Sequence, residues 1–215
     1  MTDEERLAYA LKGLSVLRHD VRNLMASVEI IADRMRKSED ERLAKAAPML
    51  VDSMRRTVEL GVAAGELASV EVGTPERVAL AAAAARAIDA NPQRGAGAVD
   101  ASGLGDHTVR ATPAHVDRML GALIDNGLAL ADPGEVALRA EADGDAVVVT
   151  ARCAGQVPDY AREKIFVPYG GAKRRGGTGL GLPIARIMAE AAGGTATLQE
   201  TGEDGTVFAL RLPKG

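Results

Sequence analysis

Residues 177–194 read GTGLGLPIARIMAEAAGG, in which three alternating glycines lead into apolar residues at helical spacing. Glycine permits positive φ and close backbone approach, and the first turn of a helix offers unpaired N–H groups to an anion such as phosphate. The run matches neither a Walker phosphate loop nor a dinucleotide-binding fingerprint. We therefore predict a glycine-rich turn that opens a helix over residues 180–192 and binds phosphate groups. A turn without a ligand is the alternative.

The chain around this turn alternates between helical and strand patterns from residue 76 to residue 215. Period-2 alternation between turn residues favours short strands, whereas apolar residues every three or four positions favour helices. Helices on one side of a mixed sheet form an α/β sandwich, which is the fold we predict for this half. The expected helices cover residues 76–90, 114–131 and 180–192, and the expected strands cover residues 98–104, 108–111, 136–142, 146–151, 195–200 and 207–212.

The chain before the Val72-Gly73-Thr74-Pro75 linker has an entirely helical pattern, broken only by polar residues 37–40. Two antiparallel helices with narrow apolar stripes bury too little surface alone, so we expect two copies of the chain to pair as a four-helix bundle. The sequence thus predicts an α+β protein with a helical dimerisation domain over 1–72, which carries the histidine considered next, and a second domain over 76–215. The heptad stripe of the first helix comprises Leu14, Leu17, Val21, Leu24, Val28, Ile31 and Met35.

His19 lies on this first helix at the heptad position farthest from the apolar stripe. Asp20 is its neighbour, and Arg22 and Asn23 follow at three and four residues, on the same helix face. An exposed imidazole beside a carboxylate can accept a phosphoryl group, because the carboxylate orients and deprotonates one ring nitrogen while the other attacks. An ordinary solvated histidine beside a charge pair is the alternative, and the helix alone favours it.

The composition excludes several classes of protein. With 26 Lys and Arg against 30 Asp and Glu, the net charge is near −4, which disfavours general nucleic-acid binding. A single cysteine, Cys153, excludes a disulfide framework and any zinc site with two thiolates. No segment approaches the roughly 20 apolar residues that a membrane span needs, and the N-terminus lacks the order of a secretion signal. We expect a cytoplasmic protein that binds neither nucleic acid nor membranes.

Four motifs, in order along nearly the whole chain, resemble those of the two-component histidine kinase family. Residues 19–23 (HDVRN) are similar to its phosphoacceptor box and residues 123–127 (LIDNG) to its N box. Residues 162–169 (REKIFVPY) are similar to its F box and residues 177–182 (GTGLGL) to its second glycine box. The resemblance implies the ATPase fold of histidine kinases for the second domain and phosphoryl transfer as the activity.

The resemblance also implies a role for each matched residue. The phosphoacceptor group would be His19 with Asp20, Arg22 and Asn23 in support. The nucleotide group would be Asn126 as the Mg²⁺ ligand, the phosphate-binding glycines Gly177, Gly179 and Gly181, and the cations Lys173, Arg174 and Arg175 of a shortened lid. A solvated basic loop is the alternative for those three cations.

The first glycine box departs from the family pattern. The family has Asp-x-Gly-x-Gly before a proline-containing turn, and aligning that turn with Val157-Pro158 puts Arg152 at the aspartate and Ala154 and Gln156 at the glycines. The family aspartate accepts a hydrogen bond from the adenine amino group, whereas arginine has donors only. On this alignment we expect impaired ATP binding and a weak or vestigial nucleotide site.

Three functions remain open. We favour a histidine phosphotransferase that carries a phosphoryl group on His19 to or from a response-regulator aspartate and needs no cofactor of its own. The altered adenine box favours it, as does a helical segment that follows Met1 with no sensor domain before it. Its partners would be receiver domains, a second copy of the chain, and an upstream histidine kinase or hybrid kinase. A cytoplasmic autokinase that uses ATP and Mg²⁺, sensing through a partner, and a non-catalytic signalling scaffold are the alternatives.

Overall fold

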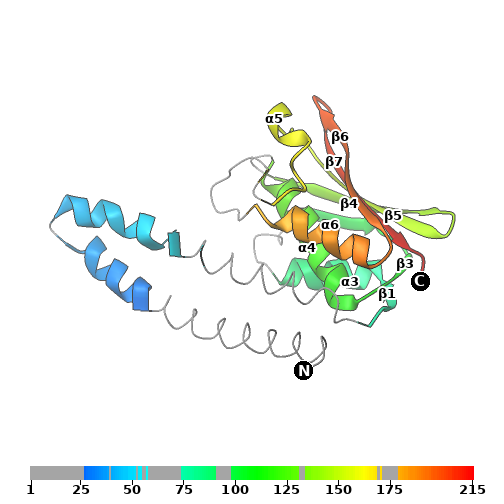
Figure 1. Cartoon of the computed structure of the whole chain (residues 1–215), viewed down its shortest axis with the longest axis horizontal. Helices are drawn as coiled ribbons and strands as arrows, with labels where there is room; N and C mark the ends of the chain where they lie inside the picture. The colour runs from blue at the N-terminus through cyan, green and yellow to red at the C-terminus, as the bar shows by residue number, and fades with distance from the viewer. Residues whose placement is uncertain are drawn as a thin grey trace, which may run out of the picture. The chain divides into compact units, whose positions relative to one another are not determined.

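The chain divides into two compact units, Met1–Ser69 and Val70–Gly215. The computed structural model (Figure 1) describes residues 27–38, 40–51, 53, 54, 57, 74–90, 98–130, 134–168, 170 and 179–215. No helix within these ranges is long and apolar enough to cross a membrane. The domain limits expected from the sequence, 1–72 and 76–215, stay a prediction.

The described part of the first unit is helical on both sides of a polar break. Helix covers residues 27–36 and 41–51. Between them the N–H of Arg42 donates to Asp40 Oδ1 at 2.9 Å, and the N–H of Asp40 donates to Ser38 Oγ at 3.2 Å. Such side-chain oxygens satisfy N–H groups that a helix start leaves unpaired. The expected break is confirmed, whereas the antiparallel hairpin and the dimeric bundle stay predictions.

The second unit alternates strands and helices, and each strand expected from the sequence is present within two residues of its expected limits. In chain order the elements are β1 (Glu76–Ala79), α3 (Leu80–Asp89), β2 (Val99–Gly103), β3 (Thr108–Ala111), α4 (Pro113–Leu128), β4 (Val136–Asp143), β5 (Ala146–Cys153), α5 (Asp159–Arg162), α6 (Gly181–Ala191), β6 (Thr195–Gly202) and β7 (Gly205–Pro213).

Five of these strands form one mixed sheet in the order β2-β4-β5-β7-β6. β2 and β4 are parallel, and the other neighbours are antiparallel. Helices α3, α4 and α6 lie together on one face of the sheet (Figure 1), and the expected α/β sandwich is therefore confirmed for this unit. The largest fully buried side chains of its core include Phe208, Leu80, Leu104, Met119, Leu120, Leu123, Ile124, Leu138 and Ile184.

The expectation of one helix over residues 76–90 is wrong at its start. Residues Glu76–Ala79 form β1, which pairs antiparallel with β3 in a separate two-stranded sheet. Val78 is buried between exposed neighbours, as the alternation of a strand requires. The helix begins at Leu80. Pairing with a distant strand thus outweighs the weak helical preference of four residues.

A bidentate ion pair joins α3 to α4. Arg86 Nε donates to Asp117 Oδ2 at 2.8 Å and Arg86 Nη2 to Asp117 Oδ1 at 2.7 Å, which raises the pKa of the Arg86 guanidinium. We expect a double-mutant cycle of Arg86→Ala and Asp117→Ala, measured by urea unfolding, to give a coupling energy of about 0.5–1 kcal/mol. The exposed Arg186–Glu190 pair of α6 is the comparison and should couple about half as strongly. Equal coupling in both pairs would contradict the stronger role of the bidentate pair.

His115, in the first turn of α4, is buried, and burial lowers the pKa of its imidazole from the ordinary value of 6.5. At a pH between the two values, His115 therefore binds a proton in the unfolded chain but not in the folded protein. The free energy of unfolding should therefore fall as the pH drops below about 6.5 and level off below the lowered pKa. Urea melts of the wild type and His115→Gln from about pH 7.5 to pH 5 measure this loss, which should be smaller in the variant. Parallel losses in the two proteins would refute the prediction.

Candidate functional site

Helix α4 holds the side chain of Asn126 in a fixed orientation. The residues before it, from Met119 to Ile124, are buried and anchor the helix in the core. Asn126 Nδ2 donates to the carbonyl oxygen of Ala122, one turn earlier, at 2.7 Å. This bond orients the amide group of a half-buried side chain. Its oxygen is a hard ligand of the kind that Mg²⁺ accepts.

The first turn of α6 lies against Asn126. A Cβ placed on Gly181 would be 3.6 Å from Asn126 Nδ2 and 3.7 Å from Ala122 Cβ, so a larger side chain there would fill the space beside the amide. Gly179 has a φ of 72°, in the region that favours glycine. The structure thus brings Asn126 together with the start of an 11-residue helix. There, backbone N–H groups and the helix dipole favour phosphate.

The other predicted site residues lie outside the described residues, and their roles stay predictions. They are His19, Asp20, Arg22 and Asn23 of the phosphoacceptor group, and Lys173, Arg174, Arg175 and Gly177 of the nucleotide group. In the part of the chain that the structure describes, no group of three or more His, Cys, Asp or Glu side chains could hold a metal ion.

The last two residues of β5 face opposite sides of the sheet. Successive side chains of a strand alternate between its faces, and every second residue from Val147 to Cys153 is buried whereas Arg152 is exposed. On the helix side, a Cβ added to Gly127 of α4 would be 3.5 Å from Cys153 Cβ. Cys153 therefore faces α4 beside the residue that follows Asn126.

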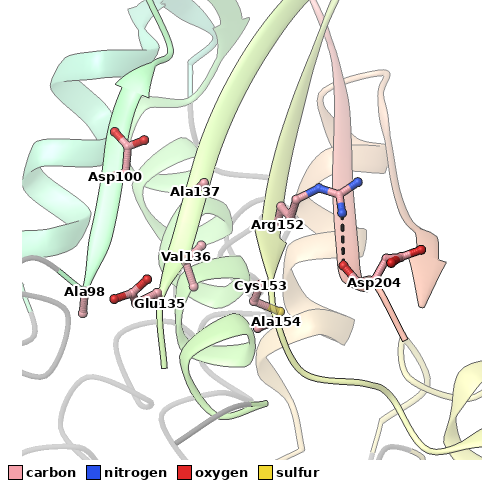
Figure 2. Close-up of a pocket in the computed structure, with 9 residues that line it drawn as sticks. All are labelled: Ala98, Asp100, Glu135, Val136, Ala137, Arg152, Cys153, Ala154 and Asp204. Atoms are coloured by element: carbon pink, nitrogen blue, oxygen red, sulfur yellow. Dashed lines mark hydrogen bonds between the residues drawn. The ribbon is translucent and has the colours of Figure 1, made fainter. Parts of the chain in front are cut away.

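Arg152 lies on the outer face of the sheet, away from the helices. Its guanidinium is within 3.1 Å of Glu200 Oε2 and donates to the carbonyl oxygen of Asp204 at 3.3 Å (Figure 2). The alignment on Val157-Pro158 thus gives the adenine-binding position to a side chain on the face of the sheet opposite the helices. Arg152 also lines a cavity of about 440 Å³, formed by Ala98, Asp100, Glu135, Val136, Ala137, Arg152, Cys153, Ala154 and Asp204.

Two threonines of the β6–β7 hairpin hold the loop that follows β5. Thr206 Oγ1 donates to the Gly155 carbonyl at 2.7 Å, so Thr201 Oγ1 donates to Thr206 Oγ1 across 2.8 Å. Thr201 Oγ1 also accepts the N–H of Val157 at 2.9 Å. This chain of hydrogen bonds fixes the backbone just beyond Cys153. Sequence reasoning missed Cys153 and Thr206 as site residues, although the alternation along β5 carried the signal for the cysteine.

Gly155 occupies a position where a side chain does not fit. A Cβ there would overlap the carbonyl group of Leu130, just beyond α4. We expect Gly155→Ala to lower the free energy of unfolding by about 2 kcal/mol or more, because the backbone on both sides would have to move. Gly202→Ala is the matched control, since a Cβ at Gly202 meets no atom within 4 Å. Denaturant unfolding of both variants tests this packing, and equal stabilities would refute it.

A comparison with protein families matches residues 111–215 to the family described as histidine kinase-, DNA gyrase B-, and HSP90-like ATPase. The matched range contains α4 with Asn126, the end of β5, and the start of α6. The site assembled above therefore lies within one family domain.

Two curated relatives are sensor proteins. The chain is 37% identical over 103 residues to the sensor protein TorS of Escherichia coli K12. It is 36% identical over 128 residues to the sensor histidine kinase GtrS of Pseudomonas aeruginosa. The two alignments cover 47% and 58% of this chain but only 11% and 26% of the relatives. The chain thus corresponds to a small part of each of these longer proteins.

Solved structures share the fold. Full-length ShkA in complex with AMPPNP superposes with a TM-score of 0.65 at 20% identity, over 95% of this chain and 46% of that one. The Acinetobacter baumannii histidine kinase AdeS gives a TM-score of 0.60 at 17% identity, over 90% of this chain and 94% of that one. At these identities the likeness shows the fold.

Proposed function

Because residues 111–215 belong to the histidine kinase-type ATPase family and the chain is homologous to sensor histidine kinases, we propose that it is an ATP-dependent histidine kinase of a two-component system. The second unit binds ATP, His19 accepts the γ-phosphoryl group, and a response-regulator aspartate receives it from His19. This proposal replaces the phosphotransferase with impaired ATP binding that sequence reasoning favours.

One observation carries the proposal: Asn126 and Gly181 lie next to each other, with room between them for no more than a Cβ, and Arg152 is turned away from them. This arrangement puts the residue whose amide oxygen would hold Mg²⁺ beside a helix N-terminus that would bind phosphate. The residue that argued against ATP points to the other face of the sheet, where its charge is paired with Glu200. Arg152 itself therefore gives no reason to reject ATP.

The residues present fit Mg²⁺, which commonly binds through one or two protein oxygens together with substrate phosphates and water. When bound, the ion neutralises negative charge on the transferring phosphoryl group. Asn126 supplies the protein oxygen in this proposal. The first-turn N–H groups of α6 donate to the phosphate oxygens, where negative charge builds up in the transition state.

In the transfer step, a ring nitrogen of His19 attacks the γ-phosphorus. The bond from phosphorus to the β,γ-bridging oxygen breaks, and ADP leaves with its electron pair. Asp20 takes the proton of the other ring nitrogen and keeps the imidazole oriented. Transfer to the regulator then breaks the N–P bond and forms an aspartyl phosphate.

Apolar side chains on the first unit support pairing with a second copy of the chain. Five of them are 39–73% exposed on the two described helical segments, and exposed apolar side chains gathered on one element favour an interface. Burial of this surface in a homodimer would stabilise the helices that carry His19. The five residues are Ile30, Ile31, Leu43, Met49 and Leu50.

A histidine phosphotransferase is the second candidate. The first glycine box of the family has an aspartate that binds adenine, whereas the residue that faces α4 at the end of β5 in this chain is Cys153. A thiol is a weak hydrogen-bonding group. A site unable to hold adenine would leave His19 dependent on phosphorylated receiver domains as donors.

The two candidates differ in their phosphoryl donor. The purified chain is incubated with Mg²⁺ and γ-labelled ATP in one reaction, and with a labelled phosphorylated receiver domain in another. The proposed kinase takes label from ATP. Label from the receiver domain alone would support the phosphotransferase, and label from neither donor would support a scaffold.

A further inference from the structure

We propose that the nucleotide site of this chain does not select adenine over a purine with a carbonyl group at position 6, so that adenine and inosine nucleotides bind alike. The inference rests on the proposed nucleotide-binding function and deepens it, because it concerns the base end of the same site.

The path of α4 indicates which part of the site would hold the base of the nucleotide. Asn126 meets the start of α6, which binds phosphates in the proposed function. Gly127, the next residue, lies beside Cys153 at the end of β5, and the Leu130 carbonyl lies against Gly155. About one helical turn of α4 therefore leads from the phosphate end to the end of β5. When the phosphates of a nucleotide lie at the start of α6, its base therefore lies near the end of β5.

Among the residues that the structure describes, those on the helix side of β5 offer no strong acceptor to an amino group. On the helix side of β5 the residues are Val147, Val149, Ala151 and Cys153, none of them acidic. Cys153 is 4% exposed, and its Sγ lies 3.8 Å from the carbonyl oxygen of Thr206. A thiol donates and accepts only weakly, so it distinguishes an amino group from a carbonyl group poorly.

The threonine hydroxyls do not replace a carboxylate. Thr206 is fully buried, and its proton goes to the Gly155 carbonyl. Thr201 gives its proton to Thr206 and accepts the N–H of Val157. These bonds hold the loop beyond β5. A site selects strongly for a polar group only when its own buried polar groups would otherwise lose their partner.

The test compares ADP with IDP, which differ in the group at position 6 of the purine and in the proton that IDP carries on the neighbouring N1. Calorimetric titration of the full chain with each diphosphate and Mg²⁺ gives two dissociation constants, which should agree within about threefold for the wild type. Cys153→Asp adds an acceptor on the helix side and should shift their ratio toward ADP by about tenfold or more.

Arg152→Asp is the matched control. It adds the same carboxylate one residue earlier, on the outer face, and should leave the ratio of the two dissociation constants unchanged. A shift in this variant without one in Cys153→Asp would overturn the inference. Should Cys153→Asp fail to fold, the wild-type ratio decides by itself.

A wild-type preference for ADP of about tenfold or more overturns the inference and leaves the proposed kinase intact. Failure of the wild type to bind either diphosphate contradicts the kinase itself, and with it the ground of the inference. The two failures are therefore distinguishable in one set of titrations.

Discussion

His19→Ala is expected to abolish phosphorylation of the chain, whether the donor is ATP or a phosphorylated receiver domain. Alanine has no nucleophilic nitrogen, so the covalent step has no acceptor, and the rate of labelling should fall by about a thousandfold or more. Acid-labile label on the purified variant, measured with each donor in turn, checks this. Undiminished label would show that the phosphoacceptor is another residue.

His107→Ala is the matched control for this variant. His107 lies in the second unit just before β3, and its backbone carbonyl accepts the N–H of Leu80 at 3.0 Å. Replacing its side chain should leave both labelling reactions at the wild-type level. Loss of label in both histidine variants would point to a general loss of folding.

Asn126→Ala is expected to reduce ATP-dependent labelling by about a hundredfold, because it removes the oxygen that holds Mg²⁺ against the phosphates. Labelling from a phosphorylated receiver domain should be unchanged, since that reaction does not use the nucleotide site. The two initial rates, measured on the same preparation, separate a defect in the nucleotide site from a defect in the chain as a whole.

Two further variants sharpen this prediction. Asn126→Asp retains an oxygen ligand and should recover part of the lost rate, whereas Arg152→Ala alters only the outer face and should keep it. Equal loss from both donors in Asn126→Ala would contradict a specific role in the nucleotide site, as would a large loss in Arg152→Ala.

Local signals made most of the second unit predictable. Asp143-Gly144-Asp145 between two alternating apolar runs predicts a hairpin, and the structure has β4 and β5 there with Gly144 at a φ of 62°. Gly193, at a φ of 77°, lies where the sequence predicts the end of α6. Turns and helix ends depend on a few adjacent residues, which is why a sequence can reveal them.

Features that depend on distant partners were not predictable in the same way. Residues Glu76–Ala79 look like part of an alanine-rich helix, and only their pairing with β3 makes them a strand. The proximity of Asn126 to Gly181 likewise depends on the packing of α4 against α6, although each residue was a candidate by itself.

The end of β5 shows how one residue of register changes a functional conclusion. Alignment on the Val157-Pro158 turn selects Arg152, whereas the burial pattern selects Cys153. Because side chains alternate, a slip of one residue moves every side chain to the other face of a sheet. The alternation of residues 147–153 was visible in the sequence, but an alignment anchored on the Val157-Pro158 turn does not take it into account.

The most direct test of the proposed kinase is to locate the phosphoryl group after reaction with ATP. The purified wild-type chain is incubated with Mg²⁺ and ATP, kept at alkaline pH to preserve a phosphoramidate, and mapped by tandem mass spectrometry. The account predicts phosphate on the imidazole of His19. A chain that carries no phosphate after ATP, yet acquires it on His19 from a phosphorylated receiver domain, would contradict the kinase and establish a phosphotransferase instead.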